Sequence, residues 1–158
     1  MKTIKLEIIF KSYQYEELSE DDRRLIDQAK EAALTSYSPY SKFGVGAAVL
    51  LDNGEVVCGS NQENAAYPSG ICAERTTLFY ANSRYPDAAV VTIAVAAHNA
   101  DGFISRPIPP CGGCRQVMIE VEQRYHRPLR ILLYSTTEVY ELYGSKSLIP
   151  IQFGQEFL

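Results

Sequence analysis

The sequence predicts an α/β protein whose helices cover both faces of a mixed β-sheet, in a three-layer α/β/α sandwich. Three features indicate this class: a hairpin pattern around residue 53, a nearly continuous apolar run at 90–97, and helical apolar spacing before, between and after them. A chain of 158 residues suits one domain, and a hydrophobic content of 46% can build a sizeable core. We therefore expect a single domain over 1–158, with residues 1–18 as an N-terminal extension or arm.

The first half of the chain is expected to contain a helix and a hairpin after this arm. Residues 5–10 have the composition of a short strand or an ordered arm. Ser19 precedes three acidic residues, and a serine cap with negative charge in the first turn favours a helix over 20–36. An Asn-Gly pair separates two strand-like runs at 46–51 and 55–59, which is typical of a hairpin.

The second half of the chain is expected to alternate helices with strands. Apolar residues recur at helical spacing over 72–83, and a second helix is expected over 111–125. The apolar run at 90–97 has the length of a strand and the composition of one buried on both faces. Residues 130–134 are expected to form another strand, and 139–142 one more. Strands that alternate with crossover helices after an initial hairpin predict the mixed sheet.

Charge and N-terminal composition restrict the function. The formal net charge is −4, without a long block of lysines or arginines, and nucleic-acid binding depends largely on neutralising phosphates. We therefore expect no nucleic-acid partner. Residues 1–10 lack the long apolar stretch of a signal peptide or a membrane span, so we expect a cytoplasmic protein without a membrane partner. In that compartment four cysteines indicate metal binding or chemistry before disulfides.

Three of the cysteines have the spacing of a catalytic zinc site. Cys111 and Cys114 are three positions apart, so they share one helical face, and Cys72 could supply a third sulfur. Structural zinc normally has four protein ligands, whereas catalytic zinc keeps its fourth position for water. Glu74 lies two residues from Cys72, near enough to reach that water without binding the metal. Three cysteines, a Glu that is not a ligand and a Pro-Cys-x-x-Cys run form a signature of nucleobase deaminases.

The expected helix starts favour metal binding. Cys72 would open one helix, and Cys111 and Cys114 would occupy the first turn of another. Unpaired N–H groups and the helix dipole lower thiolate pKa values there. Three thiolates leave a divalent zinc with a net negative charge, which Arg75 would offset. The alternatives are a surface ion pair for Arg75 and an ordinary dipole-stabilised helix residue for Glu74.

The remaining cysteine and the two histidines are not expected to bind metal. If Cys58 joined the other three cysteines, the site would be a closed structural zinc. Cys58 ends an expected strand, however, whereas the others begin helices, so we expect a buried free thiol. His98 and His126 lack metal-ligand spacing and are expected to be exposed or locally hydrogen-bonded.

Four segments resemble the small, homotetrameric type of cytidine deaminase. They are the loop-and-strand signature at 37–48, the ribose-binding loop at 61–68, the first zinc motif at 72–75, and the second zinc motif with its helix at 110–118. Their order and spacing match from about residue 19 to the C-terminus. The resemblance implies a five-stranded cytidine deaminase-like fold, one zinc ion per subunit, and a homotetramer with shared active sites.

The resemblance also implies a reaction. It is the hydrolytic deamination of cytidine and 2′-deoxycytidine to uridine and 2′-deoxyuridine, with release of ammonia, in pyrimidine salvage. Glu74 would take a proton from the attacking water and pass protons to ring N3 and to the departing amine. The family arginine that matches Arg75 hydrogen-bonds the zinc thiolates.

Asn61 and Glu63 are the expected sugar contacts. They follow a strand and lie two positions apart, so both side chains could point into one pocket. An amide and a carboxylate suit a hydroxyl that both donates and accepts. As the alternative, they are turn residues that satisfy their own loop. The resemblance implies that they hold the ribose 3′-hydroxyl.

The other substrate contacts rest on the resemblance alone. It implies that Phe43 packs beside the pyrimidine and that Ala73 offers its backbone N–H to the pyrimidine O2. Tyr67 would reach the 5′ side of the sugar from a neighbouring subunit. Phe153 resembles the phenylalanine of a Ser-Phe-Gly element that stacks on the base across a subunit interface, although Gln152 replaces the serine.

Three alternative functions stay open. The first is a deaminase for a modified cytosine nucleoside such as blasticidin S, which shares the zinc motifs; Asn61, Glu63 and Phe43 favour the plain nucleoside. The second is a polynucleotide-editing module on the same scaffold, against which the acidic charge argues. The third is a non-catalytic zinc protein that uses all four cysteines.

Overall fold

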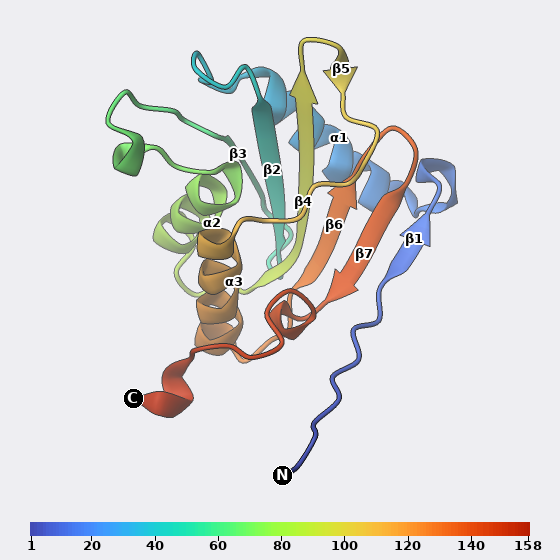
Figure 1. The fold of residues 1–158 in the computed structure, drawn as a ribbon. Coiled ribbons are helices and arrows are strands. Elements are labelled where there is room, and N and C mark those ends of the chain that lie inside the picture. Colours follow the sequence, from blue (N-terminus) through green and yellow to red (C-terminus); the bar gives the residue numbers. More distant parts are fainter.

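The computed structural model describes residues 1–158 as a sheet between helices (Figure 1). The strands are β1 (Lys11–Tyr13), β2 (Gly44–Leu51), β3 (Val56–Ser60), β4 (Val90–Asn99), β5 (Gly102–Phe103), β6 (Arg130–Tyr134) and β7 (Val139–Tyr143). The α-helices are α1 (Glu20–Leu34), α2 (Ala73–Arg84) and α3 (Gly112–Tyr125), with short 3₁₀ turns between elements and at the C-terminus. None of the helices has the length and apolarity that crossing a membrane requires.

The sheet is mixed, as expected. Its strand order is β1-β7-β6-β4-β2-β3, with β5 paired to β4 outside this path. Only β4 and β6 are parallel, and α3 lies in the crossover between them. The expected five strands correspond to β2, β3, β4, β6 and β7. The short strands β1 and β5 bring the total to seven, so the expected strand count was too low while the fold class is confirmed.

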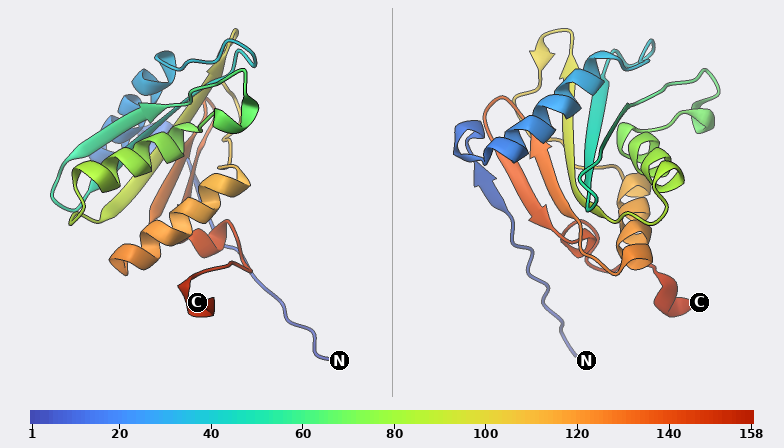
Figure 2. Two further views of the ribbon diagram at one scale, coloured as in Figure 1. Left: turned by 90° about the vertical axis from the view of Figure 1, so that its left-hand side faces the viewer. Right: turned by 180° about the vertical axis from the view of Figure 1, so that it is seen from behind.

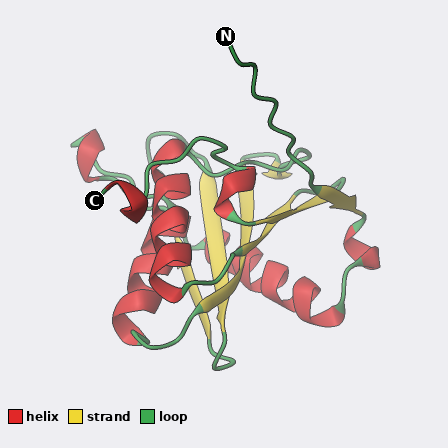
Figure 3. Cartoon of the chain, turned by 90° about the horizontal axis from the view of Figure 1, so that it is seen from below, coloured by secondary structure: helices red, strands yellow, loops and turns green.

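Helices cover both faces of the sheet, which makes three layers (Figures 2 and 3). Helix α1 lies on one face and contributes Leu25, Ile26 and Ala29 to a cluster with the buried side chains of that face. Helices α2 and α3 lie on the other face, where Leu78 and Met118 belong to a larger apolar cluster. The site described below lies on this second face, where α2 and α3 begin.

The local signals for α1 and for the hairpin are confirmed. Ser19 caps α1 by accepting a hydrogen bond from the Asp22 N–H at 3.2 Å. The helix ends at Leu34, two residues before the expected end. Gly54 has a φ of +86°, which a glycine adopts without strain in the turn between β2 and β3.

Helix α1 approaches β2 closely because β2 contains a glycine at the contact. A Cβ atom on Gly46 would lie 2.1 Å from the Ala29 carbonyl oxygen and 2.2 Å from the Ala33 nitrogen. These are backbone atoms of α1 and cannot swing away as a side chain could. The absence of a side chain at Gly46 therefore sets the distance between this helix and the sheet.

The expected N-terminal strand lies later in the chain than predicted. Residues 5–10 form no regular structure, and the strand is Lys11–Tyr13, paired with β7. In this register Lys11 lies opposite Glu141, and β7 ends at Tyr143. Residues before Ile9 consequently have no strand to pair with.

Candidate active site

The three zinc-motif cysteines lie at the starts of two helices. Cys72 is the N-cap of α2 and Cys111 is the N-cap of α3, both with extended backbone conformations. Cys114 is the third residue of α3 and is fully buried. This placement agrees with the sequence pattern and directs the free N–H groups of both helix starts toward the same region.

The three sulfurs form a compact group that fits a metal ion. All three lie within 4.8 Å of one another. The Sγ of Cys111 lies 3.6 Å from that of Cys72 and 3.4 Å from that of Cys114. Tetrahedral zinc with Zn–S bonds of about 2.3 Å would separate its sulfurs by about 3.8 Å, so only small shifts are needed to hold the ion.

Cys58 is not part of this group, and its expected burial is wrong. The side chain is exposed. Cys58 lies opposite Ala48 in β3, the outermost strand on its side of the sheet. Ala48 belongs to the cluster on the α1 face, which is the face away from the three sulfurs. Burial fails because an edge strand has a neighbouring strand on one side only.

Arg75 supports the charge of the sulfur group. Its Nη2 donates to the Cys72 sulfur at 3.9 Å, and its Nε is buried without a hydrogen-bond partner. Hydrogen bonds from Cys114, Cys111 and Arg75 outweigh partial burial and lower the pKa of Cys72 to about 5. A cation beside a sulfur that is already ionised at neutral pH is the arrangement expected next to a thiolate-ligated metal.

Glu74 is a buried carboxyl group beside the sulfurs. Its residue is only 4% exposed, and it lines the same cavity as Cys72 and Cys111. Burial raises the pKa of Glu74 above its ordinary value. The protonated form is therefore populated closer to neutrality, as a group that both accepts and donates protons requires.

These groups open into a cavity of about 720 Å³. Its walls come from the loop before β2, the loop between β3 and α2, the start of α2, and the segment before α3. A volume of this size suits a small organic ligand. Tyr40, Ser41, Ile108 and Pro109 belong to the lining and were not among the residues predicted from the sequence.

Asn61 and Glu63 line the cavity and also hold its loops in place. The Asn61 side chain accepts from the Val45 N–H at 2.8 Å and donates to the Phe43 carbonyl at 3.0 Å. The Glu63 carboxylate accepts from the backbone N–H groups of Tyr40 and Ser41, at 2.8 and 3.2 Å. The loop-stabilising alternative is thus part of their role. An amide and a carboxylate have further hydrogen-bonding capacity that these contacts do not use.

Ala73 and Tyr67 are also close to the cavity. Ala73 is the first residue of α2, so its N–H has no acceptor within the helix. Tyr67 is 78% exposed and lies edge-on to Tyr40, with ring centroids 6.2 Å apart. Its ring is therefore largely free to contact another molecule.

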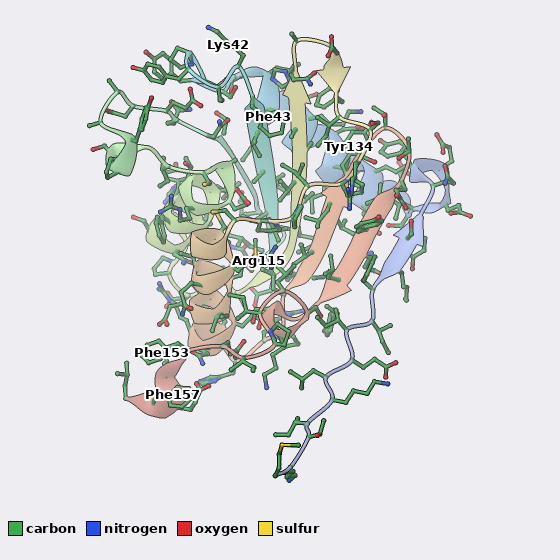
Figure 4. The ribbon with its side chains drawn as sticks, in the orientation of Figure 1. Lys42, Phe43, Arg115, Tyr134, Phe153 and Phe157 are labelled. Atoms are coloured by element: carbon green, nitrogen blue, oxygen red, sulfur yellow. The ribbon has the colours of Figure 1, made fainter.

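Phe43 and Phe153 are not among the residues that line this cavity, and Figure 4 shows them far apart on the molecule. Phe43 lines a neighbouring cavity of about 790 Å³, which shares Ile108 and Pro109 with the first. Phe153 is 58% exposed and stacks on Phe157, with ring centroids 5.7 Å apart. The structure thus brings together the cysteines, Glu74, Asn61 and Glu63 around one cavity, but neither phenylalanine is part of its lining.

The histidines take no part in the site. The His98 ring nitrogen Nε2 lies 3.0 Å from the Ala33 carbonyl oxygen. His126 ends α3 in a left-handed conformation with a φ of 49°. The other ring nitrogen, Nδ1, lies 3.4 Å from the carbonyl oxygen of the next residue, Asn99, which is the local contact expected for His98.

Fold and site together define a zinc-binding α/β protein with a buried carboxyl group at the metal. The family description "Cytidine and deoxycytidylate deaminase zinc-binding region" matches residues 19–126. The chain belongs to this family, and zinc is its cofactor.

Two relatives with related names are similar to this chain in sequence. A cytidine deaminase of Halalkalibacterium halodurans is 50% identical over 103 residues, which cover 64% of this chain and 72% of the relative. A probable cytidine deaminase of Dictyostelium discoideum is 39% identical over 142 residues, or 88% of each chain.

Solved structures agree with the fold. A crystal structure of cytidine deaminase from Burkholderia pseudomallei has a TM-score of 0.71 and 36% identity, covering 86% of this chain and all of the other. The Mycobacterium tuberculosis cytidine deaminase structure has a TM-score of 0.67 and 32% identity, covering 86% of this chain and 99% of the other.

Proposed function

We propose that this chain is a zinc-dependent cytidine deaminase that converts cytidine and 2′-deoxycytidine to uridine and 2′-deoxyuridine, with release of ammonia. The observation that carries the proposal is the buried carboxyl group of Glu74 beside three clustered thiols, in a cavity of nucleoside size. Membership of the cytidine and deoxycytidylate deaminase family supports it.

Cys72, Cys111 and Cys114 would hold the zinc. When bound, the ion supplies Lewis-acid activation of the attacking water. Arg75 adds to the effect of the neighbouring cysteine thiols in keeping the Cys72 sulfur ionised, and would offset the negative charge of the thiolates. Because the chain offers three sulfur ligands, a four-coordinate zinc held by them would have one position left for chemistry.

Glu74 would carry the protons. Its carboxylate accepts a proton from the attacking water and gives it to the ring N3 of cytosine as the water oxygen adds to C4. The carboxylate then takes the remaining proton from the hydroxyl on C4 and gives it to the exocyclic nitrogen, so the C4–N bond breaks, ammonia leaves and the C4 carbonyl of uridine forms. Burial raises the pKa of Glu74, which stabilises the proton on it between acceptance and donation, and Glu74 lines the cavity in which the substrate would lie.

Asn61 and Glu63 would bind the ribose 3′-hydroxyl, and the free N–H of Ala73 would meet the pyrimidine O2. Phe43 would pack beside the pyrimidine at the wall that both cavities share. The backbone contacts of Asn61 and Glu63 fix their side chains before substrate arrives, which reduces the ordering cost of binding.

Tyr67 and Phe153 would act on the active sites of neighbouring subunits in a homotetramer. Their exposure, and the position of Phe153 outside its own cavity, support this. We also propose one catalytic domain preceded by an extension at residues 1–18, because the family description begins at residue 19. The role would be cytoplasmic pyrimidine salvage.

The test is ammonia release from cytidine by the zinc-loaded protein, beside a Glu74→Gln variant. Glutamine has the same shape but transfers no protons, so we expect zinc to be retained and turnover to fall by at least about 10³-fold. A folded, zinc-loaded parent that leaves cytidine intact would refute the proposal and point to a modified cytosine nucleoside.

A further inference from the structure

The N-terminal segment Lys2–Phe10, called here the arm, extends away from the edge of the sheet (Figure 1). No hydrogen bond joins the arm to the rest of the chain. Its main internal contact is Phe10, whose ring lies 4.9 Å from that of Tyr140. Ile4, Leu6 and Ile8 are 73%, 55% and 47% exposed. A run of large apolar side chains in water, with unpaired backbone groups beside them, is typical of a strand that pairs with another chain.

The arm has two different faces when extended. Side chains of an extended chain alternate between its faces, so Ile4, Leu6, Ile8 and Phe10 share one face. The charged residues Lys5 and Glu7 lie on the other. The arm precedes residue 19, where the match to the family description begins.

The sequence of the arm is complementary to itself in the antiparallel direction. When two copies pair with Leu6 opposite Leu6, each Lys5 lies opposite the Glu7 of the other copy, and each Ile4 lies opposite an Ile8. Opposite charges stabilise directly facing positions, and apolar pairs do the same on the other face. We infer that the arm is a self-recognition strand that pairs with the arm of a second copy of this chain about a twofold axis at Leu6.

Three other pairings of the two arms bring like charges together. Parallel in-register pairing would place Lys5 against Lys5 and Glu7 against Glu7. An antiparallel pair centred on Lys5 or on Glu7 likewise faces two equal charges. Like charges opposite one another destabilise a strand pair, so among these four arrangements the charges favour the one centred on Leu6.

The sheet anchors this pairing. A two-stranded ribbon alone is marginally stable in water. Each arm, however, continues directly from β1, which is hydrogen-bonded to β7 at the edge of the sheet. Pairing of two arms would therefore lengthen two existing edge strands and cover backbone groups that are otherwise unpaired.

Disulfide trapping tests the register. The cysteine variants are made in a zinc-loaded Cys58→Ser background. Directly opposed residues of an antiparallel pair have Cα atoms about 4.5–5.5 Å apart, within the range that a disulfide spans. We expect Leu6→Cys to form covalent dimers by itself under mild oxidation. Thr3→Cys and Ile9→Cys, which face each other across the pair, should form dimers only when both variants are produced together.

The matched positions make the result decisive. If Thr3→Cys or Ile9→Cys alone forms dimers as readily as Leu6→Cys, the arm collides at random and the inference is wrong. An absence of dimers from Leu6→Cys also overturns it. Cytidine turnover does not enter this test, so its outcome is independent of the proposed function.

Charge exchange gives a second test. In the Leu6→Cys protein, Lys5→Glu or Glu7→Lys alone should lower the yield of covalent dimer by about tenfold, because like charges then face each other. The double exchange restores opposite charges and should restore the yield. Equal yields in all four proteins would contradict the pairing.

Discussion

The Nε of Arg115 donates a 2.7 Å hydrogen bond to the carbonyl oxygen of Pro110, the residue immediately before Cys111. The Nη1 of the same guanidinium donates to the Leu148 carbonyl, also at 2.7 Å. Arg115 lies near the start of α3 (Figure 4). One planar group thereby ties the loop that presents a metal-site sulfur to the segment that leads to Phe153.

Arg115→Lys is expected to weaken zinc binding about tenfold, because residues that orient metal ligands typically contribute this much. An ammonium group cannot reproduce two hydrogen bonds with the fixed geometry of a guanidinium, so the free energy of unfolding should also fall by about 1–2 kcal/mol. Arg124→Lys is the control, since Arg124 lies on the same helix and donates to Pro86 instead. Competition with a chromogenic chelator measures the affinities, and equal values for both variants would count against this role.

Zinc content should separate Cys58 from the other cysteines. We expect Cys58→Ser to retain one zinc ion per chain and Cys114→Ser to lose it, because Cys114 belongs to the sulfur group and Cys58 does not. Metal analysis after gel filtration measures this, and zinc loss from Cys58→Ser would indicate a closed four-sulfur site.

Cys58 should be the one cysteine of the zinc-loaded protein that a thiol reagent can modify, because the other three would bind the metal. The Cys58 side chain is exposed, but partial desolvation of its sulfur, together with the nearby Glu31 carboxylate, raises the pKa of Cys58. Its thiolate fraction at pH 7 is then smaller than that of free cysteine, so a disulfide reagent should react slowly and accelerate as the pH rises. A reaction rate equal to that of free cysteine at neutral pH would contradict this environment.

The contact between α1 and β2 should be intolerant of a single methyl group. Gly46→Ala places a Cβ against backbone atoms of α1, so we expect the free energy of unfolding to fall by about 3 kcal/mol or more. Gly113→Ala is the matched control, because open space surrounds that position in the first turn of α3. Its effect should stay within about 1 kcal/mol. Urea unfolding of both variants measures the difference.

Arg130 joins two carboxylates from different elements. It binds Asp22 of α1, with Nη2 donating to Oδ2 at 2.9 Å, and also Glu141 of β7. Partial burial acts to raise the pKa of each carboxyl group, but hydrogen bonds from Arg130 outweigh it, and both pKa values lie below the ordinary range. The unfolded chain therefore binds these protons more readily, and the stabilisation present above about pH 5 is lost as the pH falls through the lowered values.

Arg130→Gln should lower the free energy of unfolding by about 2 kcal/mol at pH 7, less than a fully buried pair would, because Arg130 keeps some contact with solvent. The difference from the parent should shrink below about pH 4, where the carboxylates become neutral. Arg24→Gln, which removes an exposed partner of Glu20 and Asp21, should have an effect under about 0.5 kcal/mol at either pH. Denaturant titrations at both pH values measure this, and a constant difference would contradict the assigned network.

Local chemistry made much of the fold predictable. Ser19 specifies a helix start, and the Asn-Gly pair specifies a tight turn, without help from distant residues. The position of β1 was not predictable in this way, because it depends on where β7 ends. The exposure of Cys58 likewise depends on the order of strands, which puts β3 at the edge.

The site likewise has features that local sequence predicts and features that depend on the conformation of distant segments. The spacing of Cys111 and Cys114 and the neighbouring pair Cys72 and Glu74 predicted the sulfur group and the buried carboxyl beside it. The backbone contacts of Glu63 and the two carbonyls held by Arg115 depend on loop conformations that no local pattern specifies.

Cys72 and Cys111 are separated by 39 positions, and the whole of β4 lies between them. A zinc ion held by both is therefore a removable cross-link that closes a long loop of the unfolded chain, with a correspondingly large entropic effect. The folded fraction then follows the free zinc concentration by mass action. In a zinc-starved cell, proteolysis of the loosened chain would lower the abundance of the protein, so its level would report metal supply.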